Sequence, residues 1–228
     1  MIEKVSDAQQ NFLQTFGLAH PVIQGPMGGV AGPRLVSAVA NAGALGMLPI
    51  WLVSPAAAAR SIAATRALTD KPFAVNLRAD LVQHEHIKVA LDAGVDWLHL
   101  FWGDPKDSVR SLNVGSDTGS LKMLATVGDA EAARAALAAG ASTLIAQGVE
   151  AGGHVLSEQP LQQLLDSVLS VAGPVPVIAA GGCANAADAQ RLVAQGAAGV
   201  LLGTRFVASI ECDAHPAFKS AILDAGAR

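Results

Sequence analysis

The residues best suited to chemistry stand together in the segment AQGVEAGGH (146–154), which places an amide, a carboxylate, paired glycines and an imidazole after an apolar run. Histidine titrates near neutral pH, so His154 can take up or release a proton when the fold holds it in position. A surface-loop histidine is the alternative, and we favour catalysis because His154 follows paired glycines at the end of an apolar run. Glu150 is also consistent with a loop ion pair.

Other apolar runs end in residues that could bind a ligand. QGPMGGVAG (24–32) carries glycines that permit close approach of the backbone, although a flexible turn is the alternative. Asn76 ends a further run and offers both a donor and an acceptor, as turn-forming asparagines also do. AAGG (179–182) and LLGTR (201–205) supply backbone N–H groups near helix starts, an arrangement that favours anions. Together these two loops predict a phosphorylated ligand.

The remaining histidines, cysteines and aromatic residues give weaker indications. His99 lies inside an apolar run and could point into the protein, where a satisfied core histidine is the more common case. Cys183 lies beside the predicted phosphate loop but fits the role of a small buried hydrophobe. Phe101 and Trp102 are candidates for a substrate wall, with a role in the core as the alternative. No Cys/His cluster has the spacing of metal ligands, so we expect no metal site.

Eight short apolar runs must position these residues, and each is nearly continuous rather than alternating, as expected of strands buried on both faces. They lie at 21–27, 44–50, 73–77, 97–103, 121–127, 142–148, 175–182 and 199–209. Ala- and Leu-rich helical patterns separate them, and several end in a Gly that stops a helix. Eight strand–helix units predict the α/β class and a (β/α)8 TIM barrel. An open doubly wound sheet is the alternative, which the absence of an early GxGxxG turn disfavours.

The composition indicates one globular domain over residues 1–228, with residues 1–20 as a lead-in helix that covers the bottom of the barrel. Hydrophobic residues make up 51% and charged residues 15%, which excludes a disordered chain. The net charge of −4 and the lack of a basic cluster give no support for nucleic-acid binding. No apolar run reaches the roughly 18 residues of a membrane span. With no signal peptide at the N-terminus, we expect a cytoplasmic protein in which Cys183 and Cys212 are free thiols rather than a pair.

A resemblance to a known family rests on five motifs in this order: PVIQGPMGGVAGPRLVSAVANAGALG, KPFAVNL, AQGVEAGGH, PVIAAGG and LLGTRFVAS. They are similar to the nitronate monooxygenase (2-nitropropane dioxygenase-like) family of FMN-dependent (β/α)8 barrels, over about residues 20–222. The flavoprotein enoyl-[acyl-carrier-protein] reductase II shares nearly the same motifs. The resemblance therefore implies an FMN cofactor.

The resemblance also implies roles for matching residues. His154 matches the catalytic histidine, which would handle a proton of the substrate or polarise its oxygen. The positions implied to contact the flavin ring, its pocket or its phosphate are Gly25, Pro26, Met27, Asn76, Gln147, Gly152, Gly181, Gly182, Gly203 and Thr204. Two departures are the lack of the family's C-terminal covering segment and a short stretch, 155–159, after His154. Both would leave the flavin more open to water and weaken catalysis that excludes solvent.

These features lead to one preferred function and two alternatives. We expect oxidation of alkyl nitronates by oxygen to carbonyl compounds and nitrite, with a small nitronate or nitroalkane and oxygen as the partners. An NAD(P)H-dependent enoyl-thioester reductase with the same FMN pocket is the runner-up. A shortened barrel that binds flavin without turnover is the third hypothesis. A homodimer stays open, since its apolar surface cannot be separated from the core by pattern alone.

Overall fold

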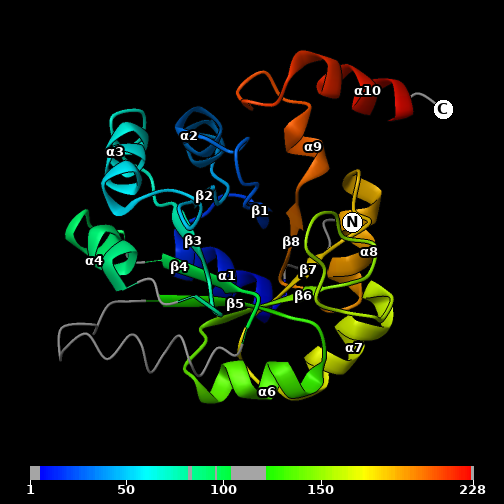
Figure 1. Cartoon of the computed structure of the whole chain (residues 1–228). Helices are drawn as coiled ribbons and strands as arrows, with labels where there is room; N and C mark the ends of the chain where they lie inside the picture. Colours follow the sequence, from blue (N-terminus) through cyan, green and yellow to red (C-terminus); the bar gives the residue numbers. More distant parts are fainter. Residues whose placement is uncertain (1–5, 82–83, 96, 104–121, 227–228) are drawn as a thin grey trace.

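The computed structural model describes residues 6–81, 84–95, 97–103 and 122–226, and its centre is an eight-stranded parallel sheet in the order β1-β8-β7-β6-β5-β4-β3-β2 (Figure 1). The strands are β1 Val22–Gln24, β2 Met47–Pro49, β3 Ala74–Arg78, β4 Trp97–Phe101, β5 Lys122–Val127, β6 Thr143–Gln147, β7 Val177–Ala180 and β8 Gly199–Leu202. Each falls within one of the eight apolar runs or extends it by a single residue. The order places the first and the last strands side by side.

Hydrogen bonds between β1 and the residues before β2 join the two edges of this sheet. The backbone N–H of Gln24 donates to the carbonyl of Leu45 (2.9 Å), and the N–H of Leu45 donates to the carbonyl of Val22 (3.0 Å). The fully buried side chain of Gln24 continues this seam, because its Oε1 accepts from the N–H of Met47 and its Nε2 donates to the carbonyl of Met47, both at 3.2 Å. The fold is therefore the predicted (β/α)8 barrel and not the open sheet.

Helices surround the barrel (Figure 1). They are α1 Asp7–Phe16, α2 Pro33–Asn41, α3 Pro55–Arg66, α4 His84–Asp92, α6 Ala130–Ala138, α7 Leu161–Ala172, α8 Ala186–Ala194, α9 Thr204–Val207 and α10 Pro216–Gly226. Side-chain caps explain several starts: Ser54, Asp129 and Asn185 each accept the backbone N–H three residues later. The run at 199–209, predicted as one element, divides into β8 and α9, because the chain turns at Gly203. The connection at 104–121 lies outside the described residues.

Side chains of the strands alternate between two apolar cores. Outward-facing residues such as Val75 and Leu98 are buried beneath the helices. Inward-facing residues near the amino ends of the strands, such as Met47 and Trp97, fill the lower barrel. Helix α1 lies at this end, where the ring of Phe16 stacks on Trp97 with centroids 3.7 Å apart. The barrel is therefore packed, not open, below the site.

The same alternation turns polar residues inward above the apolar layer. Asn76, His99 and Thr126 each lie two residues beyond an inward-facing apolar residue of the same strand, and Asn76 pairs with His99 in the β3–β4 register. Another two residues along their strands, Arg78 and Phe101 reach the mouth of the barrel. The carboxyl ends of the strands therefore carry the polar groups, as expected of a barrel with its site there.

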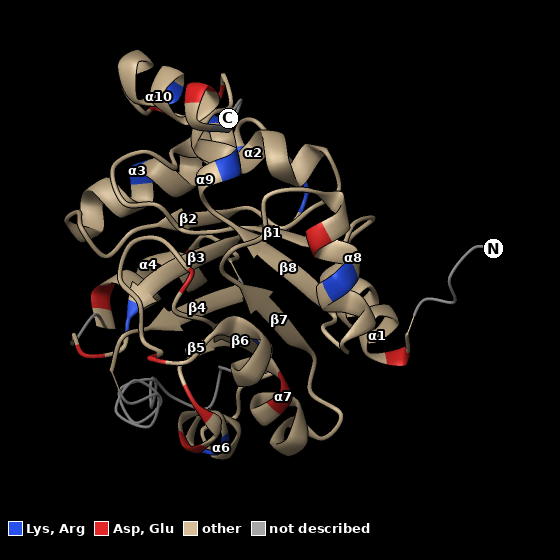
Figure 2. Cartoon of the chain, turned by 90° about the vertical axis from the view of Figure 1, so that its right-hand side faces the viewer, with Lys and Arg blue, Asp and Glu red and all other residues tan. Residues whose placement is uncertain are grey.

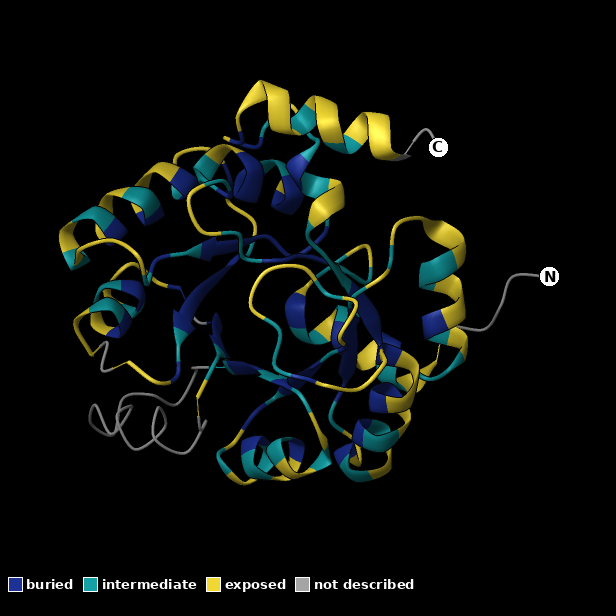
Figure 3. Ribbon diagram, turned by 45° about the vertical axis from the view of Figure 1, so that its right-hand side comes forward, coloured by how far each residue is buried: buried dark blue, intermediate teal, exposed yellow. Residues whose placement is uncertain are grey.

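The surface separates into a charged periphery and a few apolar exposures. Charged residues lie mostly on helices and connecting loops (Figure 2), while the strands are buried (Figure 3). Helix α10 is almost entirely exposed and includes Phe218 and Leu223 on its surface (Figure 3). Among the described helices, none combines the length and the apolar character that crossing a membrane requires.

Candidate active site

A chain of hydrogen bonds crosses three strands just below the mouth of the barrel. Nδ2 of Asn76 lies 3.0 Å from Nδ1 of His99, and Nε2 of His99 lies 2.7 Å from Oγ1 of Thr126. Asn76 and His99 are both buried. Burial lowers the pKa of His99 to about 3, because the apolar surroundings disfavour the charged imidazolium. His99 is therefore a neutral imidazole inside the barrel, as the expectation of a satisfied core histidine implies.

Gln147, at the end of β6, holds the loop that carries His154. Its Nε2 donates to the backbone carbonyl of His154 (3.1 Å), and its Oε1 accepts from the backbone N–H of Leu156 (3.1 Å). One amide thus fixes a loop that contains Gly148, Gly152 and Gly153 and would otherwise be adaptable. The sequence predicted Gln147 as a lining residue of the flavin pocket, and its contacts also make it the support of His154.

Aromatic residues at the end of β4 pack against the exposed imidazole of His154. The ring centroid of Trp102 lies 5.3 Å from that of His154 with an edge-on geometry of 77°, and the ring of Phe101 lies 6.3 Å away. Trp102 has a positive φ of 60°, a conformation that costs free energy in any residue other than glycine. The N–H of Asp80 donates to the Trp102 carbonyl (2.9 Å), which helps to hold this strained turn. The predicted substrate wall therefore touches the predicted catalytic residue.

Arg78 reaches the same end of the barrel from β3 between two indole rings. Its guanidinium carbon lies 5.2 Å from the ring centroid of Trp51 and 5.9 Å from that of Trp102, within the range of cation–π attraction. Nε of Arg78 also donates to Oδ1 of Asp80 (2.8 Å). This hydrogen bond lowers the pKa of the Asp80 carboxyl and raises the pKa of Arg78. Sequence reasoning missed Arg78 and Trp51, although alternation from Asn76 could have pointed to Arg78.

Glu150 caps a helix, and it forms no ion pair within the described residues. Its two carboxylate oxygens accept from the backbone N–H of Leu161 (2.9 and 3.2 Å) at the first residue of α7. The residue before that helix, Pro160, supplies no side-chain cap. Gly148 makes the approach possible, since a Cβ there would lie 2.5 Å from the Cα of Leu161. The loop with His154 is therefore tied to α7 as well as to β6.

The glycine loops after β7 and β8 leave backbone donors uncommitted. Gly181 and Gly182 both have positive φ values, 124° and 60°, and a Cβ at Gly203 would meet only Sδ of Met27, at 4.0 Å. No acceptor within the described part of the chain takes the N–H groups of Gly182, Cys183, Gly203 or Thr204. Because β7 and β8 are neighbours, these donors belong to one corner of the mouth. Such a donor set suits a phosphate.

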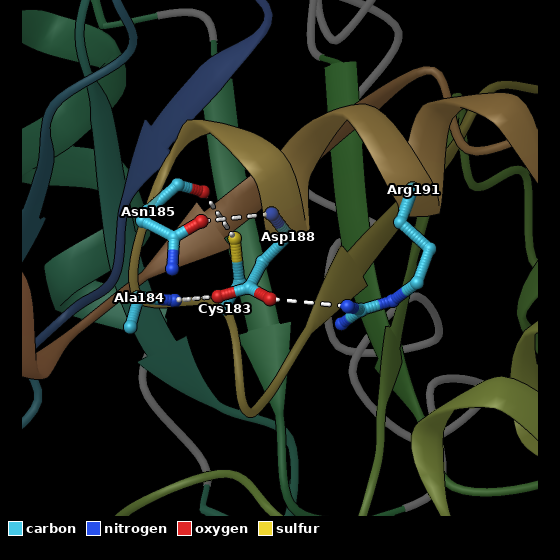
Figure 4. Close-up of polar contacts among 5 residues, drawn as sticks. All are labelled: Cys183, Ala184, Asn185, Asp188 and Arg191. Atoms are coloured by element: carbon cyan, nitrogen blue, oxygen red, sulfur yellow. Dashed lines mark hydrogen bonds and ion pairs between the residues drawn. The ribbon is translucent and has the colours of Figure 1, made fainter.

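Side chains satisfy two of the N–H groups around the start of α8 (Figure 4). Oδ1 of Asn185 accepts from the N–H of Asp188 (3.0 Å), and Oδ2 of Asp188 accepts from the N–H of Ala184 (3.0 Å). Asp188 also forms an ion pair with Arg191 (3.1 Å). The pKa of the Asp188 carboxyl is lowered, chiefly by the hydrogen bond from the N–H of Ala184. Burial raises the pKa of the Cys183 thiol, and Asp188 adds to this. Within the described residues, N–H groups without an acceptor therefore lie in the two glycine loops and also at Ala186 and Ala187 of this helix start.

The loop after β1 contacts the end of β8, the neighbouring strand. The N–H of Gly25 donates to the carbonyl of Leu202 (2.8 Å), and a Cβ at Gly25 would lie 2.8 Å from Cδ2 of Leu201. Met27 folds back through its carbonyl, which accepts from Val30 and Ala31. A larger residue at 25 would displace the side chain of Leu201, and the packing of β1 on β8 places Pro26 and Met27 beside the loop after β8.

The predicted residues gather in three connected groups. Asn76 contacts His99, whose ring faces Phe101 at 6.3 Å, and Phe101 faces His154. Gln147 contacts the His154 loop. The first loop, with Gly25, Pro26 and Met27, adjoins the loop with Gly203 and Thr204, and Gly181 and Gly182 adjoin the loop with Glu150. Gly152 is exposed, and a Cβ there would meet nothing within 4 Å.

Comparison with known proteins gives matches over most of the chain. The profile of the family described as nitronate monooxygenase matches residues 10–228. (3aS,4S,5R,7aS)-5-hydroxy-7a-methyl-1-oxo-octahydro-1H-indene-4-carboxyl-CoA dehydrogenase of Mycobacterium tuberculosis is 36% identical over 93% of this chain and 59% of its own length. A nitronate monooxygenase of Paraburkholderia phytofirmans is 31% identical over 95% of this chain and 71% of its own length.

Solved structures show the same architecture. FabK from Thermotoga maritima has a TM-score of 0.83 and 33% identity, covering 92% of this chain and 66% of the other. A nitroalkane oxidase from Streptomyces ansochromogenes has a TM-score of 0.78 and 29% identity, covering 92% of this chain and 72% of the other. The chain spans less than three fifths of the length of the indene-carboxyl-CoA dehydrogenase that it resembles.

Proposed function

Because the chain belongs to the nitronate monooxygenase family, we propose that it is an FMN-dependent oxidoreductase that oxidises alkyl nitronates with oxygen to carbonyl compounds and nitrite. One observation carries this proposal: a histidine held by Gln147 and uncommitted backbone donors occur at the same end of the barrel. A substrate-handling imidazole and a phosphate cradle are the two parts that such an enzyme needs.

The donor set fits the phosphate of FMN. The N–H groups of Gly182, Cys183, Gly203 and Thr204 would take up phosphate oxygens, and the glycines let a ligand approach the backbone closely. Asp188 occupies the start of α8, so a phosphate there would meet a carboxylate. Gly25, Pro26, Met27 and the rim of the barrel near Asn76 would then receive the ring system, with Gln147 and Gly152 along its pocket.

When bound, the flavin supplies the electron acceptance that no side chain can provide. The residues of this chain do the rest. The imidazole of His154 would donate a hydrogen bond to an anionic nitronate oxygen or move a proton at the substrate carbon. Trp102 and Phe101 contact the imidazole of His154, and Gln147 donates a hydrogen bond to the backbone carbonyl of His154.

An acyl-thioester oxidoreductase is the second candidate function. The relative named as a carboxyl-CoA dehydrogenase is 36% identical to this chain, whereas a named nitronate monooxygenase is 31% identical. His154 would serve either reaction, because its imidazole could donate a hydrogen bond to an anionic nitronate oxygen or supply the proton that the α-carbon of an enoyl thioester gains on reduction. The two candidates therefore differ in the electron donor and in the substrate, not in the catalytic histidine.

A binding assay followed by two turnover assays tests the proposal. We expect the protein to retain FMN after desalting, and to consume oxygen and release nitrite with the nitronate of 2-nitropropane. NADPH-dependent reduction of crotonyl-CoA would instead favour the second candidate. A protein that does not retain FMN would contradict both.

His154→Asn tests the role of the histidine. We expect turnover to fall by about a hundredfold or more, as for loss of a general acid–base group. The Kd for FMN should stay within about threefold, since the contacts of His154 are to Gln147 and aromatic rings and not to the glycine loops. His20→Asn, an exposed histidine before β1, is the matched control and should change neither quantity. Equal turnover of His154→Asn and wild type would refute the assigned role.

A further inference from the structure

The hydrogen-bond chain from Asn76 through His99 to Thr126 involves more residues than the proposed function requires. Asn76 alone was expected to meet the flavin, yet its side chain is bonded to a histidine on the next strand, which is bonded to a threonine on the strand after that. Asn76 and His99 are only 1% and 2% exposed, so solvent does not replace these contacts. Such a buried line of polar groups must be satisfied in a definite donor order.

A backbone carbonyl sets that order. The Nδ2 atom of Asn76 lies 3.3 Å from the carbonyl oxygen of Leu77, and a carbonyl can only accept. The atom facing it is therefore the amide nitrogen, which has a second hydrogen for Nδ1 of His99, 3.0 Å away. Nδ1 then carries no hydrogen, so a neutral His99 must carry it on Nε2 and donate it to Oγ1 of Thr126 (2.7 Å).

This order leaves one group of the Asn76 amide without a partner. Both hydrogens of its nitrogen are engaged, by His99 and by Leu77. Within the described residues, no hydrogen bond to its oxygen Oδ1 is present. The amide oxygen and nitrogen are nearly equal in size, so only the hydrogen-bond partners decide which of the two is presented to a ligand.

We propose that His99 is a positioning residue that fixes the Asn76 amide so that its oxygen, and not its nitrogen, is offered to the cofactor. The ligand group that this oxygen recognises is an N–H of the flavin ring, which rests on the proposed binding of FMN. Thr126 takes part by accepting the hydrogen on Nε2, and because its hydroxyl could equally donate, the tautomer of His99 is set on the Asn76 side. If His99 carried its hydrogen on Nδ1, the amide would turn and present its NH2 group instead.

The tautomer of His99 is measurable on the protein without any activity assay. We would record 15N spectra of the histidine-labelled protein and assign His99 by its absence from His99→Phe or His99→Gln. The expected result is a neutral ring with its hydrogen on Nε2, unchanged between about pH 5 and pH 8. A hydrogen on Nδ1, or protonation within that range, would overturn the proposal.

FMN affinity tests the link from His99 to the cofactor. His99→Phe removes the acceptor for Asn76 while keeping a ring, and we expect the Kd for FMN to rise about tenfold, the effect of one hydrogen bond. His99→Gln keeps an acceptor oxygen and should stay within about threefold of wild type. The double variant His99→Phe/Asn76→Ala should bind FMN no more weakly than Asn76→Ala alone, because His99 acts through Asn76.

Thr143→Val is the control for general damage to the barrel interior. Thr143 is also fully buried, and its hydroxyl donates to the carbonyl of Ser142 away from Asn76. It should lower Tm without changing the Kd for FMN. Unchanged FMN affinity in His99→Phe, or additive losses of affinity in the double variant, would overturn the role of His99 and leave the proposed function standing. Failure of wild type to bind FMN would overturn the proposed function too, and the tautomer separates these failures because it is read without FMN.

Discussion

His99 carries the largest shift from ordinary acid–base behaviour among the described residues. Burial alone lowers its pKa to about 3, and its two ring nitrogens are both used in hydrogen bonds to neutral partners. Protonating the ring would place a charge among Asn76, Thr126 and apolar neighbours, and no carboxylate among the described residues compensates it. The residue is thus placed to stay neutral.

The free energy of unfolding should therefore depend on pH through His99. The unfolded chain binds a proton below about pH 6.5 while the folded protein does not until about pH 3, so stability is full at neutral pH and is lost as pH falls. Between pH 7 and pH 5, wild type should lose about 2 kcal/mol more than His99→Gln. Denaturant unfolding at both pH values measures this difference. Parallel losses in the two proteins would show that His99 titrates normally.

At the scale of elements, hydrogen bonds tie the loop after β6 to both a strand and a helix. Gln147 bonds the loop to the end of β6, and Glu150 caps the first N–H of α7. Gly148 permits the close contact with Leu161. The imidazole of His154 is exposed, so burial does not fix its position; these backbone anchors and the contact with Trp102 do.

Glu150→Ala should destabilise the protein by about 1 kcal/mol, since the N–H of Leu161 loses its acceptor at a helix start. Denaturant unfolding at neutral pH measures the change. Glu158→Ala, an exposed glutamate in the same loop region, is the matched control and should lie within about 0.5 kcal/mol of wild type. The capping role fails if the two variants are equally stable.

At the scale of the whole molecule, the barrel depends on the seam between β1 and β2. Both strands are three residues long, and the backbone bonds between them involve Leu45, which precedes β2. The amide of Gln24 supplies the next two bonds, to the N–H and the carbonyl of Met47. A side chain therefore takes the place of a backbone ladder at the point where the sheet closes on itself.

Gln24→Leu keeps the approximate size of the side chain but leaves two buried backbone groups of Met47 unpartnered. We expect a loss of about 3 kcal/mol in the free energy of unfolding. Gln9→Leu, at a buried glutamine of α1 that takes no part in the hydrogen bonds between β1 and β2, should cost less and serves as the control. Thermal or denaturant unfolding of both variants decides the matter, and a Gln24→Leu protein as stable as wild type would exclude this role for the seam.

Sequence alone determined the architecture of this protein and predicted the general place of its site. Continuous apolar runs and the glycines between helix and strand are local features, and local features fix which residues form strands buried on both faces. The eight strands and their order followed from that pattern. His154 and the glycine loops were likewise recognisable, because their residue types and their places after apolar runs can be read directly from the sequence.

Only the tertiary structure decided what several of these residues touch. Gln147 supports the His154 loop, Glu150 caps α7, and Asn76 is bonded through His99 to Thr126 on a third strand. These contacts depend on strand register and loop path, which join residues 7 to 27 positions apart and leave no periodic trace in the sequence. The neutral state of His99 follows from burial on all sides, which is a property of the closed barrel and not of any segment of it.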